Sequence, residues 1–348
     1  MASTERRRET RILSRRERFQ QKISRRIVPK GEAFFGRMER SVNERPGAVK
    51  AGPTSPERVN ILGRTAQVPD FVAPPAMPNN IPNMIGSFRG IRRSIRELDE
   101  NPAEPGTTID EAGIEALEAF AKSAGALSIG YAEVPERLVF KGYAILHPHA
   151  VVLTMEMDKE RIDQAPSKNT GLAVHETYSR LGRVSNEVAG YLRRQGYSAH
   201  AGHPLNGMAL YPPIAEAAHL GGRGMHGLLI TPEMGPTVRI AAVFTSIENL
   251  PVPEGENPHA WVTEFCDHCR LCAKRCPVDA VYDEPIEHED GRLTCVSDER
   301  CLPYFAVTHG CSICVAVCPF NKAGYERLHG SVEASGHREA VAQHVDAG

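Results

Sequence analysis

Nine cysteines are the residues of this chain best able to do chemistry, and eight of them fall in two runs near its C-terminal end. The first run ends in a Cys-Pro step and consists of Cys266, Cys269, Cys272 and Cys276. The second run ends in the same way and consists of Cys301, Cys311, Cys314 and Cys318. Thiolates at these spacings bind [4Fe–4S] clusters.

The first spacing is that of a bacterial two-cluster ferredoxin, in which the cysteine before proline ligates the other cluster. One cluster would therefore be bound by Cys266, Cys269, Cys272 and Cys318. The second would be bound by Cys276, Cys301, Cys311 and Cys314. A structural zinc site needs only four thiolates and does not require a Cys-Pro at the end of both runs, which favours two clusters.

The ninth cysteine leaves one ligand undecided. Cys295 precedes Cys301 by six residues, and either thiol could complete the second cluster. We favour Cys301, because only this residue leads directly through Leu302-Pro303-Tyr304-Phe305 into the second run. Cys295 is then expected to be a small buried hydrophobe.

Size and composition indicate one large domain with a small module, since the chain has 348 residues of which 41% are hydrophobic. Cysteines gathered at metal-binding spacing indicate a reducing compartment. The sequence has no run of about 18 apolar residues, so no membrane span is expected. The basic N-terminus is not followed by an apolar stretch, so we predict a cytoplasmic protein rather than a secreted one.

The net charge of −2 conceals an uneven distribution. Residues 1–50 contain 15 Lys or Arg and 6 Asp or Glu, whereas the rest of the chain contains 26 and 37. A basic arm ahead of an acidic body can bind nucleic acid, an anionic membrane or an acidic protein. The alternative is an arm that packs back on its own body.

Periodicity predicts the elements that precede the cysteine runs. Helices are expected over 109–124, 172–194 and 213–219, and strands over 126–132, 150–157 and from 197. The strand at 150–157 is expected to be buried on both faces. We also expect 228–230 and 238–244 to form two paired strands joined by a turn.

These elements indicate an α+β or α/β fold, because mixed helices and strands precede a ferredoxin-like unit. We expect five parts along the chain: a basic arm at 1–50, a Pro-rich wrapping segment or linker at 51–85, a core at 86–255, the two-cluster module at 256–325 and a polar tail at 326–348.

A glycine-rich segment, Gly222-Arg-Gly224-Met-His-Gly227, matches GxGxxG by its letters. A dinucleotide-binding loop needs a strand before it and a helix after it. Here a helix is predicted before and a strand after, which argues against nicotinamide binding. With Gly221, these glycines are expected to let the backbone approach a large planar ligand or a neighbouring element.

Three segments together resemble the reductive dehalogenase family and the related epoxyqueuosine reductases, which share cobalamin and two clusters. They are 196–199 (GYSA), 221–235 (GGRGMHGLLITPEMG) and 263–266 (TEFC). The resemblance covers about residues 125–322, and LLITPEMGP followed by Arg239 favours the dehalogenases. It implies a nitroreductase-like core that binds a base-off corrinoid, with the two clusters beside it as an electron relay.

The resemblance also implies two catalytic residues. Tyr178 matches the proton-donating tyrosine of the family, and Arg239 matches its basic partner, which would stabilise the phenolate. From the pattern alone, a packed core tyrosine and an ordinary salt bridge are the alternatives. The chain departs from many relatives at Met225, where they have a basic residue. The aspartate of the epoxyqueuosine reductases is not found around Tyr211.

The predicted activity is the replacement of halogen by hydrogen on a small organic substrate. Its electrons would come from an external low-potential donor such as a ferredoxin or flavodoxin. Two alternatives remain open. One is epoxyqueuosine reductase-like modification of tRNA, in which the basic arm would contact phosphates. The other is a cobalamin-free iron–sulfur electron carrier.

Overall fold

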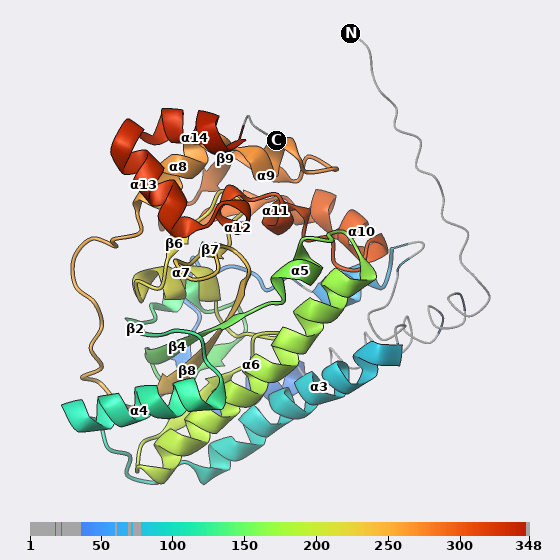
Figure 1. Ribbon diagram of the computed structural model, residues 1–348. Coiled ribbons are helices and arrows are strands. Elements are labelled where there is room, and N and C mark those ends of the chain that lie inside the picture. The colour runs from blue at the N-terminus through green and yellow to red at the C-terminus, as the bar shows by residue number, and fades with distance from the viewer. Residues whose placement is uncertain are drawn as a thin grey trace.

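The computed structural model describes residues 36–59, 61–68, 71 and 78–345, together with the isolated residues 18 and 22. Most of the predicted basic arm lies outside these residues, so its partners stay a prediction. In Figure 1 the sheet-containing domain occupies the lower part of the molecule, and the cysteine-bearing module lies on top of it.

The larger domain is built on a four-stranded antiparallel sheet with the strand order β2–β4–β8–β5. Its strands are β2 (Ile129–Glu133), β4 (His149–Glu156), β8 (Val238–Thr245) and β5 (Ala199–Gly202). β4 pairs with β8 along its full length. Six consecutive buried residues in β4 confirm that this strand is covered on both faces.

One face of the sheet is covered by α4 (Glu111–Ala124) and α6 (Lys168–Arg194), and α3 (Ile81–Arg96) lies along α6 (Figure 1). Leu181, Val184 and Val188 of α6 are fully buried against the sheet. α6 begins at Lys168 rather than at residue 172, because the Ser167 hydroxyl accepts a hydrogen bond from the Thr170 amide at 3.1 Å and caps the helix.

The other face is covered by α7 (Tyr211–Ala217) and by chain from the N-terminal part. β1 (Val49–Lys50) pairs with β3 (Ala144–Ile145), and Val42 is fully buried in the same core cluster. Residues 36–50 are therefore part of the folded domain. In this stretch the chain packs back on the body, which is the second of the two alternatives given for residues 1–50.

The prediction that 228–230 and 238–244 form paired strands is wrong. β7 (Leu229–Ile230) pairs with β6 (Gly222–Arg223), while β8 is hydrogen-bonded to β4 on one side and to β5 on the other. β8 is a central strand, so it has no edge left for β7. The intervening turn contains an isolated bridge between Thr231 and Gly235.

The module that carries the cysteines consists of short helices and one hairpin. Its elements are α8 (Trp261–Cys269), α9 (Leu271–Lys274), β9 (Val281–Glu287), β10 (Leu293–Val296), α10 (Asp298–Val307), α11 (Ile313–Ala316) and α12 (Pro319–Lys322). Asp163 of the sheet domain accepts hydrogen bonds from Asn321 at 2.7 Å and from Lys322 at 2.8 Å. These bonds fix the module to the domain.

The segment predicted as a polar tail is folded. It forms α13 (Tyr325–Ser335) and α14 (His337–Val345), and α14 packs on α8. Leu328 and Ala340 are fully buried in the same core cluster as the thiols of the first run. The segment therefore completes the core of the module, with α13 in contact with α12 and α14 in contact with α8.

Short turns of helix complete the described chain. They are η1 (Ser41–Glu44), α2 (Ile61–Thr65), η3 (Pro78–Asn80), η4 (Glu97–Glu100), η5 (Glu136–Leu138) and α5 (Lys159–Ile162). α2 belongs to the Pro-rich segment and packs on α10, where Arg64 pairs with Asp298. Nearby, Arg292 donates a hydrogen bond to the Thr54 carbonyl at 2.6 Å.

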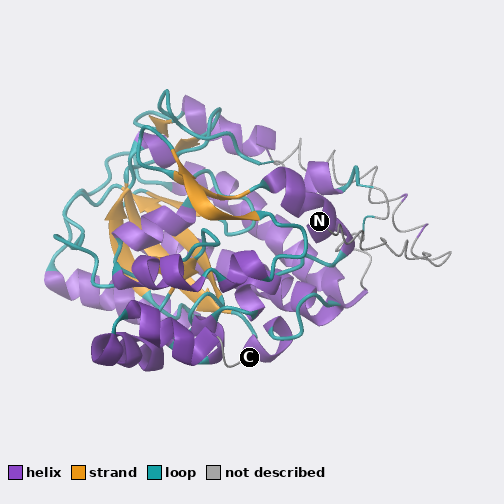
Figure 2. Cartoon of the chain, turned by 90° about the horizontal axis from the view of Figure 1, so that it is seen from above, coloured by secondary structure: helices purple, strands orange, loops and turns teal. Residues whose placement is uncertain are grey.

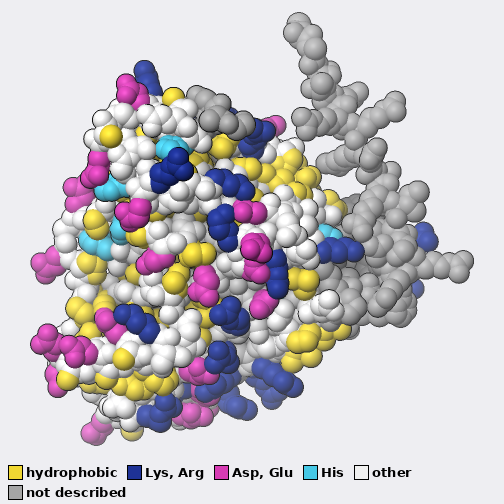
Figure 3. All heavy atoms as spheres, viewed as in Figure 1, with side chains coloured by type: hydrophobic (Ala, Val, Ile, Leu, Met, Phe, Trp, Pro, Cys, Tyr) yellow, Lys and Arg dark blue, Asp and Glu magenta, His cyan; other side chains and the backbone are white. Residues whose placement is uncertain are grey.

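An antiparallel sheet with helices around it makes this a mixed, α+β-type fold. The view in Figure 2 shows the strands inside and most helices outside. The face in Figure 3 mixes Lys and Arg with Asp and Glu over most of its described part. Among the residues that the structure describes, no helix combines the length and hydrophobicity of a membrane span.

Candidate functional site

The two cysteine runs fold alike. Arg270 in the first run and Ser312 in the second have φ angles of 52° and 66°, so each run turns through a left-handed residue. A four-residue helix follows each turn: α9 carries Cys272 and α11 carries Cys314. The two helices contact each other. The two cysteine runs therefore repeat the same backbone conformation as well as the same cysteine spacing.

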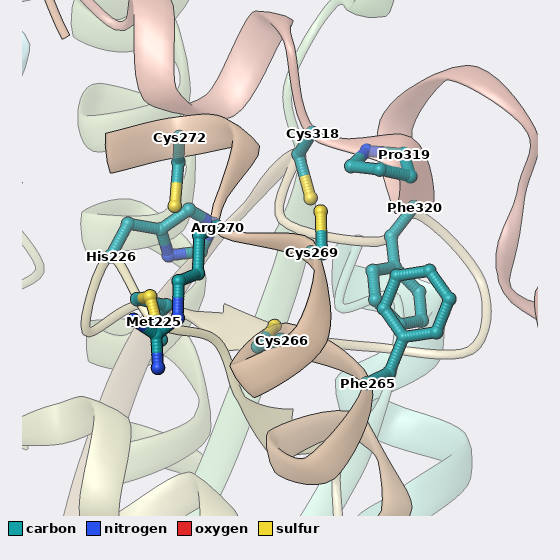
Figure 4. A pocket seen from close by; sticks show the side chains of 10 residues that line it. All are labelled: Met225, His226, Phe265, Cys266, Cys269, Arg270, Cys272, Cys318, Pro319 and Phe320. Carbon is teal, nitrogen blue, oxygen red and sulfur yellow. The ribbon is translucent and has the colours of Figure 1, made fainter. Parts of the chain in front are cut away.

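The first predicted ligand group lines one small pocket. Its four thiols come from α8, α9 and the start of α12: Cys266, Cys269, Cys272 and Cys318. In Figure 4 the sulfur atoms of Cys269 and Cys318 point toward each other, and the rings of Phe265 and Phe320 close one side. Burial raises the pKa of the Cys272 thiol to about 12. Cys318, which belongs to the second run, thus lies with three cysteines of the first run, as the ferredoxin spacing predicts.

The second predicted ligand group meets where α9, α10 and α11 come together, and it contains Cys276, Cys301, Cys311 and Cys314. Burial and then the neighbouring Cys311 and Cys276 raise the pKa of the Cys301 thiol to about 11. Burial, then Cys311, raises the pKa of Cys314 to about 12. The Ala280 amide donates a hydrogen bond to the Cys276 sulfur at 3.2 Å.

Cys295 lies near Cys266 of the first thiol group and not with the second group. It is buried on β10, and a Cβ atom on Gly227 would lie 3.4 Å from its sulfur. Its charged neighbours are Arg223 and Glu216, whereas Cys301 lies beside Cys276 and Cys311. This placement favours the predicted ligand set with Cys301.

The donor set fits clusters better than single ions. In the part of the chain that the structure describes, no three His, Cys, Asp or Glu side chains converge as ligands of one metal ion do. A [4Fe–4S] cube is ligated at its separate corners, so its thiolates surround a volume rather than a point. Two groups of four thiols, with aromatic rings beside the first, match that requirement.

A cavity of about 600 Å³ lies between the sheet domain and the module. Its wall is formed by residues 56–59, 61 and 65, the start of α6, the loop before α7, β8, and residues 305–312. His309, Gly310 and Ser312 in this wall flank Cys311. A Cβ atom on Gly171 of α6 would lie 2.6 Å from the His309 carbonyl oxygen. The second thiol group therefore adjoins the cavity.

Tyr178 and Arg239 meet in the wall of this cavity. α6 presents Tyr178 and β8 presents Arg239, whose guanidinium carbon lies 5.2 Å from the centre of the tyrosine ring. Arg239 donates to its neighbour, the Val238 carbonyl, at 3.2 Å, and its Nε is buried without a hydrogen-bond partner among the described residues. Tyr178 borders the cavity, whereas Leu181 one turn later enters the core.

His175 is a neighbour that sequence reasoning missed. It stands one helical turn before Tyr178, and the two rings are 6.2 Å apart in an edge-to-face arrangement. Burial, and then the charge of Arg239, lowers the pKa of His175 to about 4, so its ring is neutral near pH 7. In the sequence, its position three residues before Tyr178 on a predicted helix was the one indication that the two side chains are neighbours.

A second polar group lies in the same wall. Arg58, Asn206 and Tyr211 line the cavity, with Glu39 behind them. Glu39 accepts hydrogen bonds from Arg58 at 2.7 Å and from Asn206 at 2.6 Å. Burial raises the pKa of Glu39 to about 7, against the lowering effect of Arg58. Sequence reasoning missed this group, because no spacing links residues so far apart in the chain.

The four glycines predicted to bind the cofactor lie against neighbouring chain. A Cβ atom on Gly221 would lie 2.2 Å from the Ile230 carbonyl oxygen, and one on Gly222 would lie 2.4 Å from that of His259. Gly224 lies against His226, and Gly227 has a φ of 77°. The described residues that line the cavity include none of the four. Their role in cofactor binding stays a prediction.

Comparison with known protein families identifies part of the module. Residues 259–282 match the family model described as a 4Fe-4S binding domain. The match contains the whole first cysteine run, which indicates that this region binds [4Fe–4S] clusters.

Sequence relatives include two groups of enzymes. A tetrachloroethene reductive dehalogenase of Sulfurospirillum multivorans is 34% identical over 194 residues, which are 53% of this chain and 38% of that protein. One of Desulfitobacterium hafniense is 35% identical over 52% of this chain and 34% of that protein. An epoxyqueuosine reductase of Listeria monocytogenes is 32% identical over 34% of this chain and 32% of that protein. The chain thus spans less than two fifths of these relatives.

Solved structures extend the likeness beyond the matched sequence. The catabolic reductive dehalogenase NpRdhA superimposes with a TM-score of 0.62 at 17% identity, over 86% of this chain and 47% of that chain. The structure of its complex with 3-bromo-4-hydroxybenzoic acid superimposes with a TM-score of 0.64 at 18% identity, over 87% of this chain and 48% of that chain. The predicted resemblance is confirmed: the chain is similar in sequence to reductive dehalogenases and epoxyqueuosine reductases, and it shares the fold of the reductive dehalogenases.

Proposed function

We propose that this chain is a cobalamin-dependent iron–sulfur reductase that replaces halogen by hydrogen on an organic substrate in a reducing compartment such as the cytoplasm. The observation that carries the proposal is the meeting of Tyr178 and Arg239 in a cavity whose wall includes the loop around Cys311. A proton donor and an electron-delivering cluster would then adjoin one substrate cavity.

Two [4Fe–4S] clusters are part of the proposal, one in each thiol group. The contact between α9 and α11 supports a relay, because it brings Cys272 of the first group close to Cys314 of the second. Electrons from an external donor such as a ferredoxin or flavodoxin would enter at the first group. The electrons would leave from the cluster of the second thiol group, which adjoins the cavity.

Cobalamin is the proposed cofactor of the cavity. The fit rests on its apolar wall, which includes Phe140, Leu205 and Leu210, and on the buried Arg239 Nε, which has no hydrogen-bond partner among the described residues. When bound, a corrinoid supplies the reduced metal centre at which a carbon–halogen bond can be broken. The segment 221–227 lines no part of this cavity, so a backbone contact between its glycines and the corrinoid stays a separate prediction.

The residues of the chain would supply the proton. Replacing a C–X bond by a C–H bond consumes two electrons and one proton and releases halide. Tyr178 would hold the proton at its phenol oxygen and transfer it to the substrate carbon, and Arg239 would stabilise the phenolate that remains. His175 is neutral near pH 7, so it adds no second cation to the pair.

Halide release tests this function. The full chain, reconstituted without oxygen with iron, sulfide and cobalamin, should release halide from members of a panel of halogenated aromatics when a low-potential reductant is supplied. The same chain reconstituted without cobalamin is the matched control and should release none. Equal halide release from both samples, or none from either on any member, would contradict the proposal.

Epoxyqueuosine reductase-like chemistry is a second candidate, because 34% of the chain is similar to such an enzyme. The same reconstituted protein can be incubated with tRNA that carries epoxyqueuosine. Conversion of that nucleoside, without halide release from the aromatic panel, would favour this second function.

A further inference from the structure

We infer that His226 donates a hydrogen bond from its Nε2–H to a sulfur atom of the cluster in the first thiol group, and thereby sets the potential at which this cluster takes up an electron. The inference rests on the proposed function, because it needs the proposed cluster. It gives a role to the glycine-rich segment 221–227, none of which is among the described residues that line the large cavity. His226 would act through the cluster, as a positioning residue.

The imidazole of His226 borders the small pocket that the first thiol group surrounds, and the residue is 4% exposed. In Figure 4 its ring extends into this pocket from the side of Cys272. Burial raises the pKa of the Cys266 thiol to about 12, against the lowering effect of a backbone hydrogen bond from Met225. The segment that carries His226 therefore lies against the first thiol group.

A hydrogen bond within this segment determines which ring nitrogen of His226 carries the proton. The Leu228 backbone amide donates to Nδ1 at 3.2 Å. An amide N–H can only donate, so Nδ1 must accept and the ring proton is on Nε2. Nε2 is buried and has no hydrogen-bond partner among the residues that the structure describes. Buried N–H groups are ordinarily paired, and sulfur atoms of a cluster in the pocket would supply the partner.

The glycines of the segment hold the ring in place. A Cβ atom on Gly224 would lie 2.7 Å from Cε1 of His226, so a side chain there would displace the ring. The Gly227 amide donates to the Gly224 carbonyl at 2.8 Å, and the Gly224 amide donates to the Leu228 carbonyl at 2.9 Å. Gly227 completes this turn with a φ of 77°, which favours glycine. His226 is therefore held in one orientation by its own segment.

Arg270 is the other nitrogen-bearing side chain of the pocket, and it is less suited to this role. It is half-buried, and its Nε donates to the Asp267 carbonyl at 2.9 Å. Water screens a cation that is partly exposed, whereas a buried N–H acts in a medium of low dielectric constant. The buried donor is therefore the one expected to act most strongly on the cluster.

A hydrogen bond to sulfur favours the reduced form of a cluster, because reduction adds one negative charge. One electron passes from the external donor to the cluster, and His226 keeps its proton. Without this hydrogen bond, reduction should become about tenfold less favourable. For a one-electron couple, this corresponds to a potential lower by ~59 mV.

The test is a reductive titration of the full chain, reconstituted with iron, sulfide and cobalamin and followed by electron paramagnetic resonance. His226→Asn offers an amide oxygen to the Leu228 amide but loses the N–H at the Nε2 position. It should keep about eight iron atoms and lower one of the two cluster reduction steps by ~59 mV, while the other step stays. His226→Gln brings an amide N–H near the Nε2 position and should restore most of the potential.

His268→Asn is the matched control. It makes the same change beside Cys269, but the His268 side chain is exposed and its ring lies 6.4 Å from that of His337. Both reduction steps should keep their potentials in this variant. The inference is overturned if neither step moves in His226→Asn, if both steps move alike, or if His268→Asn gives the same shift.

A second measurement does not depend on the folding of a His226 variant. In the full chain with isotope-labelled histidine nitrogen, pulsed electron paramagnetic resonance of the reduced clusters should show magnetic coupling to a histidine nitrogen. Labelled His268→Asn should show the same coupling. Absence of the coupling from a chain that holds about eight iron atoms would overturn the inference alone. About four iron atoms or fewer in the unmodified chain would contradict the two proposed clusters, and the inference would fall with them.

Discussion

At the scale of single residues, the site combines one pair that the sequence pointed to with several side chains that it did not. Tyr178 and Arg239 were matched through the family resemblance, and the structure places them in contact. His175, Glu39 and Arg58 were not predicted. Their roles depend on burial and on partners far away in the chain, which no local pattern records.

Replacing the phenol oxygen tests the proposed proton donor. Tyr178→Phe should keep iron, sulfide and corrinoid content, because the ring still fills its place in the wall. Halide release should fall by roughly 10²–10⁴-fold, the usual contribution of a positioned general acid. Arg239→Met should act in the same direction, since it removes the cation that would stabilise the phenolate. Turnover of Tyr178→Phe close to that of the unmodified chain would rule out the catalytic role.

Buried histidines should make the fold sensitive to acid. Burial lowers the pKa of His147 and His175 to about 4, and that of His200 and His203 to about 3. Below pH 6.5 the unfolded chain binds protons at these rings and the folded chain does not, so the free energy of unfolding should fall as the pH drops from 6.5 to about 4. Glu39, with its raised pKa, acts in the opposite direction between about 4.5 and 7.

Urea unfolding at a series of pH values measures this effect. His203→Gln should show a smaller loss of unfolding free energy between pH 6.5 and 4 than the unmodified chain. His288→Gln is the control, because His288 lies in the β9–β10 connection, where it contacts Thr294. Equal slopes for His203→Gln and His288→Gln would show that His203 does not contribute.

At the scale of elements, the sequence predicted the helices and strands whose formation depends on local residue patterns. The apolar periodicity of α6 and the doubly buried β4 could be predicted from the sequence, and the structure has both. The partner of β8 was predicted wrongly, since strand pairing is a long-range choice that adjacency in sequence does not fix. The folded segment 326–345 was missed because few apolar residues mark its buried face.

Alanine variants test how the second cysteine run is assembled. Cys301→Ala should lose or convert one cluster, so iron should fall from about eight toward about four atoms per chain. Cys295→Ala should keep both clusters, because Cys295, on β10, packs against Gly227 and is not one of the proposed cluster ligands. Iron and sulfide analysis with electron paramagnetic resonance distinguishes the two. Loss of a cluster in Cys295→Ala but not in Cys301→Ala would reverse the assignment.

At the scale of the whole molecule, the N-terminal part, the sheet domain and the module enclose one cavity together. Residues 56–59, 61, 65 and 71 supply part of its wall, and α2 packs on α10 of the module. The charge distribution left open whether residues 1–50 bind a partner or pack on the body. The burial of Glu39 and Val42 shows that the last part of this segment belongs to the fold.

Two truncations test this arrangement. Deleting residues 1–50 removes β1 and the buried Val42, which alone stabilises the fold by roughly 1.5–3 kcal/mol, and should give insoluble or cluster-poor protein. Deleting residues 1–35 should keep clusters and corrinoid while weakening salt-dependent association with an anionic partner. The two proteins are compared by solubility and iron content. Equal stability of both would contradict the role given to residues 36–50.

The central claim is that one cavity of this chain holds a corrinoid beside two iron–sulfur clusters. Metal analysis of the reconstituted, desalted full chain tests it most directly, with the visible spectrum recorded on the same sample. We predict about one cobalt and about eight iron atoms per chain, with corrinoid bands that survive desalting. About eight iron atoms without cobalt would contradict the claim and would identify an electron carrier instead.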